Sequence, residues 1–293
     1  MSWFTQPWEH TFMQNAFMAS ILVGLICGVI GVFVVLKGLA FMGDALSHAI
    51  FPGIVIAYLL GANYLIGAMV AAILVSVLIG FASSHTHINN DSAIGVFFVG
   101  AFALGIALIS TQRTYSRDLT SFLVGSILGV SRDDLYLTAA VGAIVLLIVA
   151  LTRRELTSIA FDPVFSQADG INVRLYEQLF FIILSLAIVI SLQTVGNILV
   201  LALLVTPATT ARLLTDRLVT MIGLSALLGG LSGLLGLYFS YHFSIASGAS
   251  IVLVATAFFL IAYVFAPQTG VLTQYVRRRM HYAHPERDVF PDM

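Results

Sequence analysis

Apolar runs long enough to cross a lipid bilayer recur along almost the whole chain. Each spans about 16–24 residues, the length that a transmembrane helix needs. The runs do not alternate between apolar and polar residues, as the strands of a membrane barrel do. Only 9% of the 293 residues are charged, against about 25% in a typical soluble protein. The sequence therefore predicts an all-α fold, a polytopic transmembrane helical bundle embedded in the lipid bilayer.

We expect eight or nine spans. The candidate ranges are 16–36, 38–60, 64–82, 92–110, 135–151, 178–192, 198–213, 218–238 and 249–265. Residues 121–130 are apolar but too short to cross a membrane, so they predict a re-entrant or interfacial segment. The exact number of spans depends on this region. We expect residues 1–270 to form a single transmembrane domain and residues 271–293 to form a basic tail.

The positively charged residues predict the orientation of the bundle. With nine spans and the N-terminus outside, ten of the 13 lysines and arginines fall on the cytoplasmic side and three fall outside, as the positive-inside rule requires. This orientation puts the loop 152–177 and the C-terminal tail in the cytoplasm. No basic face exists outside that tail, so the sequence gives no support to nucleic-acid binding.

One carboxylate, Asp44, lies inside an expected span, and His48 follows one turn later on the same helix face. A charge at bilayer depth costs about 2.5–3.5 kcal/mol, so such a residue is functional by default. Pro52 lacks the N–H that would bond to the His48 carbonyl, which predicts a kink and a free oxygen beside the imidazole. Small neighbours such as Ser47 let a helix or a solute come close. These groups suit a divalent transition metal; a structural polar pair between helices is the alternative.

A second proline is expected to break the seventh span. Thr206-Pro207 would free the carbonyl of Leu203. Together with the His48 carbonyl, this oxygen would help to hold an ion. Such a site should be weak or incomplete, because a transported ion must leave as well as enter.

The loop 152–177 is expected to carry a short helix outside the membrane. Asp162-Pro163 is typical of a helix start, and Gly170 is typical of a helix end. The helix would expose Val164 and Phe165. Exposed apolar side chains on a loop helix indicate docking to a partner; a helix lying flat on the lipid surface is the alternative.

The segment from Gly43 to Gly53, GDALSHAIFPG, resembles the second-helix motif of the permease subunits of manganese, zinc and iron ABC importers. The resemblance extends over nearly the whole chain. The segment from Phe161 to Gly170 is similar to that family's cytoplasmic coupling helix, and residues 201–211 and 247–249 also resemble family stretches. Val164 departs from the pattern, because the family often has an acidic residue there.

The resemblance implies a permease in the bacterial cytoplasmic membrane, built from two copies as a homodimer or from two related chains as a heterodimer. It also implies two cytoplasmic ABC ATPases that bind ATP and an extracytoplasmic metal-binding protein. Asp44 and His48 would contact the transported Mn²⁺, Zn²⁺ or Fe²⁺, and oxygen ligands favour Mn²⁺. The expected ATPase-coupling residues are Phe161, Asp162, Pro163, Val164, Phe165 and Gly170. If the second helices of two copies meet near the dimer axis, two aspartates and two histidines would supply four ligands.

The chain is not expected to be an enzyme. It contains no G-x-x-x-x-G-K-[ST] loop, so ATP hydrolysis would reside on a partner subunit. The alternative function is a secondary carrier or channel in which Asp44 relays a cation or a proton. The loop 152–177 distinguishes the two functions, because a carrier needs no docking helix.

Overall fold

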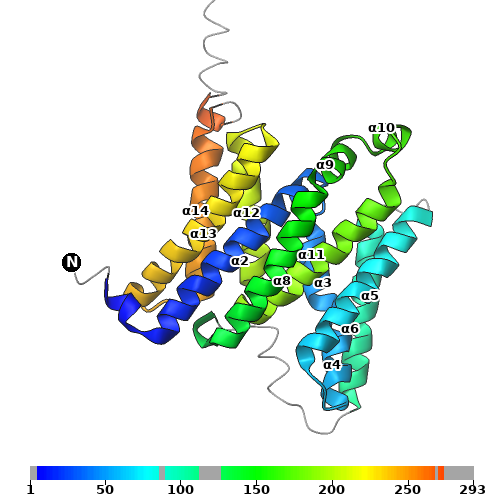
Figure 1. Cartoon of the computed structure of the whole chain (residues 1–293). Helices are drawn as coiled ribbons and strands as arrows, with labels where there is room; N and C mark the ends of the chain where they lie inside the picture. The colour runs from blue at the N-terminus through cyan, green and yellow to red at the C-terminus, as the bar shows by residue number, and fades with distance from the viewer. Residues whose placement is uncertain (1–4, 86–89, 112–126, 268–269, 274–293) are drawn as a thin grey trace, which may run out of the picture.

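The computed structural model describes residues 5–85, 90–111, 127–267 and 270–273. Within these residues every regular element is helical (Figure 1), and nine spans are long and apolar enough to cross a membrane. The predicted all-α, polytopic bundle is therefore confirmed. Most of the expected re-entrant segment 121–130 lies outside the described residues, and the part within them contains the 3₁₀ turn η2 (Ile127–Gly129).

The spans coincide with the expected ranges to within a few residues. They are α2 (Thr11–Leu36), the pair α3 (Ala40–Ala49) and α4 (Phe51–Leu59), α5 (Tyr64–His85), α6 (Asn90–Ser110), α8 (Arg132–Leu151), α11 (Val173–Val195), α12 (Asn197–Leu214), α13 (Leu218–Phe243) and α14 (Ser247–Phe265). Three further short helices of the described residues lie outside the spans, namely η1 (Gln6–Glu9), α9 (Arg153–Phe161) and α10 (Pro163–Ala168).

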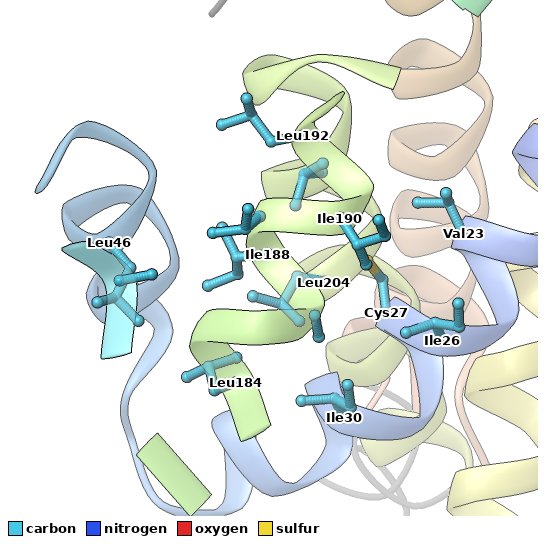
Figure 2. Packing of buried hydrophobic residues seen from close by; sticks show 14 of the residues in the cluster. Val23, Ile26, Cys27, Ile30, Leu46, Leu184, Ile188, Ile190, Leu192 and Leu204 are labelled. Atoms are coloured by element: carbon cyan, nitrogen blue, oxygen red, sulfur yellow. The ribbon is translucent and has the colours of Figure 1, made fainter. Parts of the chain in front are cut away.

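Three spans form the centre of the bundle. Buried residues make up 67% of the hydrophobic window of α2 and 72% of those of α3–α4 and α11, but only 22% of those of α6, α8 and α14. Figure 2 shows α11 between α3 and α2, with Leu184 and Ile188 of α11 lying between Leu46 of α3 and Ile30 of α2. The helix α3, which carries Asp44 and His48, is thus fixed by its packing against the central helix α11.

Close backbone contact fixes α2 against α13. A Cβ atom added to Gly24 would lie 2.6 Å from the carbonyl carbon of Gly229, so only glycine allows this approach. Small residues at such contacts are the usual means by which membrane helices pack without a hydrophobic driving force. The packing makes α2 a firm support for the neighbouring elements.

The second span is interrupted, as Pro52 predicts. Helix α3 ends at Ala49, and α4 begins at Phe51 with the proline near its start. The N–H of Ile50 faces the carbonyl of His48 from only two residues away, too close along the chain for a well-aligned hydrogen bond. The free carbonyl at His48 therefore stays a prediction.

The expected break at Pro207 is wrong. Helix α12 runs without interruption from Asn197 to Leu214. Prolines are tolerated inside membrane helices where nearby hydroxyls and local adjustments satisfy the backbone. Two threonine hydroxyls add hydrogen bonds to nearby carbonyls of α12: Thr209 donates to the carbonyl of Val205 at 2.8 Å, and Thr210 donates to that of Thr206 at 2.7 Å. Neither is the carbonyl of Leu203, so the free oxygen expected there stays a prediction.

Candidate functional site

Asp44 and His48 face each other on α3, as their spacing predicts. The imidazole Nε2 lies 3.5 Å from Oδ1 of Asp44. The His48 side chain is 33% exposed and that of Asp44 is 39% exposed, although α3 belongs to the most buried part of the bundle. The two side chains are therefore held in place and remain accessible.

Aromatic rings from α6 limit one side of this site. The ring centroid of His48 lies 5.9 Å from that of Phe98 and 5.6 Å from that of Phe102, which it meets edge to face. The rings restrict the imidazole without using its nitrogens. Their apolar surface also lowers the local polarity, which strengthens the attraction between a cation and the carboxylate.

A third polar side chain at the site, Asn197, was not expected from the sequence. Its Nδ2 lies 3.3 Å from Nε2 of His48. Asn197 begins α12 directly after Gly196, which has φ = +88° and joins α11 to α12 as a single residue. A positive φ strongly favours glycine, so this corner fixes where the amide enters the site. In the sequence, the Gly-Asn pair resembles an ordinary turn, which is why the amide was overlooked.

The other residues expected along the pathway lie elsewhere. Ser47 is fully buried and its hydroxyl donates to the carbonyl of Gly43 at 2.9 Å. Pro52 lines an apolar groove of about 680 Å³ between α4, α5 and α6 that contains neither Asp44 nor His48. Leu203 and Pro207 are buried in α12, and the carbonyl of Thr206 accepts a hydrogen bond from within that helix. None of these five side chains is hydrogen-bonded to Asp44 or His48 in the described residues.

One copy of the chain offers few strong metal ligands. No group of three or more His, Cys, Asp or Glu side chains gathers anywhere in the described residues. If Asp44 and His48 bind a metal, they supply two ligands, and further ligands would come from an amide, from water or from a second copy. Such an incomplete site suits an ion that is held briefly.

The predicted loop helix is present as α10. The Asp162 carboxylate caps it by accepting from the N–H of Phe165 at 2.9 Å, with Pro163 in the first turn. Gly170 ends the turn after the helix with φ = +85°. The exposed apolar side chains are Phe161 at 73%, Val164 at 77% and Phe165 at 65%. The predicted cap, stop and apolar surface are all confirmed.

A short hairpin holds α10 against the bundle. The hydroxyls of Ser158 in α9 and Ser166 in α10 lie 2.7 Å apart, and Leu156 and Ile159 bury the inner face of α9. Figure 1 shows α9 and α10 together at one end of the bundle, at the top. The hairpin therefore presents its apolar residues outward from a fixed base.

An ion pair lies beneath this hairpin. Nζ of Lys37 lies 3.6 Å from Oε1 of Glu177, and the lysine side chain is only 8% exposed. A cavity of about 200 Å³ beside the pair is also lined by Ile159 and Pro163 of the hairpin. Burial lowers the pKa of the Lys37 ammonium, although the charge and hydrogen bond of Glu177 act in the opposite direction. The pair joins the turn that precedes α3 to the helix that follows α10.

Comparison with known proteins gives consistent results. Residues 9–266 match the family model described as the ABC 3 transport family. The chain is 49% identical, over 94% of each chain, to the manganese transport system membrane protein MntC of Halalkalibacterium halodurans. It is 37% identical, over 90% of its own length and 97% of the relative, to a probable iron transport system membrane protein of Haemophilus influenzae. It also resembles a chain in the structure of PsaBC from Streptococcus pneumoniae in complex with Fab, with a TM-score of 0.81 and 37% identity over 95% of this chain and 99% of that one.

Proposed function

This chain belongs to the ABC 3 transport family, and from that premise we propose that it carries Mn²⁺ through a site formed by Asp44 and His48. The chain is the membrane permease subunit of an ABC importer for a divalent transition metal. It is a transport subunit, and ATP hydrolysis belongs to a separate subunit. The secondary-carrier alternative is set aside.

The observation that carries the site assignment is the accessible carboxylate–imidazole pair at 3.5 Å within the buried second span. An ionisable pair in a transmembrane helix is energetically costly, and residues of this kind usually serve a function. A carboxylate oxygen and an imidazole nitrogen both bind divalent metals, and oxygen ligands favour Mn²⁺. The manganese transporter that is 49% identical to this chain supports the same choice of cargo.

The helix α10 is proposed to couple ATP binding to the movement of the spans. Its exposed Val164 and Phe165 give a partner ATPase an apolar surface to bind, and α9 links this surface to the bundle. Movement of α10 would then shift the helices around Asp44 and His48 and alternate the side from which the ion is accessible.

The complete importer is proposed to contain two permease copies, two cytoplasmic ATPases that bind ATP, and an extracytoplasmic metal-binding protein. The positive-inside distribution supports an N-terminus outside and α10 in the cytoplasm, in the bacterial cytoplasmic membrane. A second copy would add its own Asp44 and His48, which fits the shortage of ligands in one chain.

Uptake of radioactive Mn²⁺ by proteoliposomes that contain the complete importer tests the site. Asp44→Asn and His48→Ala are each expected to lower the rate by about 100-fold, because each removes a metal ligand. Asp133→Asn is the matched control, since this exposed carboxylate lies at the start of α8 and should leave uptake normal. Full uptake by both site variants would contradict the proposal.

Co-purification of the ATPase tests the role of α10. Phe165→Glu should abolish the association because it places a charge in the apolar contact, and Leu175→Glu is the control. Leu175 is 60% exposed but lies on α11, so its substitution should leave the association intact. Retention of the ATPase by the Phe165 variant would remove the basis for docking at this surface.

A further inference from the structure

The contacts of His48 Nε2 place conflicting demands on one atom. Oδ1 of Asp44, at 3.5 Å, is an acceptor and calls for an N–H on the imidazole. Nδ2 of Asn197, at 3.3 Å, is a donor and calls for a lone pair there. A single ring nitrogen cannot be donor and acceptor at once, so these two contacts cannot both be good hydrogen bonds.

The amide of Asn197 also carries an unsatisfied acceptor. Its Oδ1 is shielded from solvent and has no hydrogen-bond partner in the described residues. Buried polar atoms are almost always hydrogen-bonded, and an exception calls for a specific explanation. The unpaired oxygen and the contested nitrogen lie within one cluster of three side chains.

A divalent cation would give the unpaired amide oxygen a partner. A half-turn of the amide about its Cβ–Cγ bond exchanges its nitrogen and oxygen, which occupy nearly the same volume. Oδ1 of Asp44, Nε2 of His48 and Oδ1 of Asn197 would then all offer lone pairs to one ion. Metal–ligand distances of about 2.1 Å place neighbouring ligand atoms about 3 Å apart, and the separations of 3.3 and 3.5 Å in the structure are close to this spacing.

We propose that Asn197 is the third metal-contacting residue of the pathway and that its amide oxygen favours Mn²⁺ over Zn²⁺. This inference rests on the proposed function. Two oxygens and one nitrogen form a hard ligand set, which suits Mn²⁺ with water completing its octahedron. Zn²⁺ favours tetrahedral sites rich in His and Cys, and no third such residue joins the pair in the described residues.

The surroundings hold the amide where this role requires it. Asn197 follows the Gly196 corner, and the helix before that corner is tied to α8. The hydroxyls of Thr138 and Thr194 lie 2.8 Å apart, and the Gln193 amide donates to Asp134 at 3.1 Å. The backbone at residue 197 is therefore anchored, which leaves the side chain to reorient.

The test measures Mn²⁺ uptake and its inhibition by Zn²⁺ in proteoliposomes with the complete importer. Asn197→Leu, which keeps the size but removes the oxygen, should lower Mn²⁺ uptake by about tenfold or more. Asn197→Asp, which keeps an oxygen, should recover part of that loss. Asn197→His should raise inhibition by Zn²⁺ relative to Mn²⁺ uptake by about tenfold, because it adds the ligand that Zn²⁺ prefers.

Asn15→Leu is the matched control. This amide also lies on a membrane helix, but it donates to the carbonyl of Val130 at 3.1 Å and does not meet the site. Its substitution should leave the Mn²⁺ to Zn²⁺ preference unchanged. Normal Mn²⁺ uptake and an unchanged metal preference in the Leu and His variants of Asn197 would overturn this inference. If Asp44→Asn abolished uptake in the same preparations, the proposed function would still stand; if Asp44→Asn were also fully active, both would fall.

Discussion

The bundle contains two ionisable pairs near the ends of α3, and they differ in how completely their members satisfy each other. Lys37 and Glu177, in the turn before α3 and at the start of α11, pair opposite charges at 3.6 Å, and the ammonium also lies 5.8 Å from the ring centroid of Phe180. Asp44 and His48 are 3.5 Å apart and are more exposed than the first pair. Nε2 of His48 also faces the amide of Asn197 at 3.3 Å, and it cannot form good hydrogen bonds to both neighbours. We call Lys37–Glu177 the closed pair, because its opposite charges satisfy each other. We call Asp44–His48 the open pair, because its oxygen and nitrogen atoms can still bind a cation.

This difference indicates different duties. A closed pair needs no further ligand, so it serves to hold two chain segments together beside the α9–α10 hairpin. The open pair is stabilised little by the contact between its own members, and a bound cation would stabilise it more. We therefore expect substitutions at Lys37 and Glu177 to change stability, and substitutions at Asp44 and His48 to change transport.

The largest expected effect separates transport from stability at the open pair. Asp44→Leu should lower Mn²⁺ uptake by about 100-fold without lowering the melting temperature of the detergent-purified permease. The reason is that the substitution removes a carboxylate that lacks a good partner and adds apolar surface to a membrane span. Uptake and thermal unfolding are measured on the same preparation; a fall in melting temperature that matched the loss of uptake would show that Asp44 is structural.

The next largest effect is expected when one member of the closed pair loses its charge. Glu177→Gln should lower the free energy of unfolding by about 1–3 kcal/mol, because it leaves the Lys37 ammonium without its counter-charge. The loss is smaller than for a fully buried pair, since Glu177 is 32% exposed. The measurement is thermal unfolding in detergent, with uptake normalised to folded protein.

A double variant provides the control for this prediction. Lys37→Met with Glu177→Leu removes both charges and should be nearly as stable as the parent, because replacing a buried pair by apolar residues is often neutral. If the double variant were instead less stable than both the parent and Glu177→Gln, the two charges would together stabilise the fold. The closed and open pairs could then not be distinguished by how well their members satisfy each other.

The titration of Lys37 gives a smaller effect that can be measured by changing the pH. Burial lowers the pKa of Lys37 from the ordinary 10.5. Between the lowered pKa and 10.5 the unfolded chain binds more protons than the folded chain, so the free energy of unfolding should rise with pH in that window. The rise cannot exceed about 1.4 kcal/mol per pH unit. Thermal unfolding at pH values just below 10.5 should show a positive slope that Lys37→Met reduces; equal slopes in both proteins would contradict the assignment.

The sequence was sufficient for the features that depend on neighbouring residues. Length and hydropathy predicted the spans, the spacing of four residues predicted that Asp44 and His48 meet, and Asp162-Pro163 predicted the start of α10. Each of these follows from the period of a helix or from the chemistry of its ends. Long separation in sequence explains what was missed: Asn197 reaches His48 across 149 positions, and Lys37 reaches Glu177 from the turn between α2 and α3.

The two proline predictions show a different limit. The rule that proline removes one backbone bond is correct, but it does not say whether the helix breaks there. The second span is interrupted before Pro52, whereas α12 continues past Pro207. Whether a helix breaks depends on the surrounding residues, so a single proline does not locate a metal ligand.

The smallest expected effect concerns Ser47, which lies next to His48 in the sequence and was expected to line the pathway. Its hydroxyl is bonded to the carbonyl of Gly43 in the same helix, and its side chain is fully buried. Ser47→Ala should therefore leave Mn²⁺ uptake within about twofold and the free energy of unfolding within about 0.5 kcal/mol, because the carbonyl keeps its helical partner. Mn²⁺ uptake and thermal unfolding check this. A loss as large as that of Asp44→Leu would mean that α3 turns during transport to bring Ser47 to the ion, and the open site would then be larger than the cluster of Asp44, His48 and Asn197.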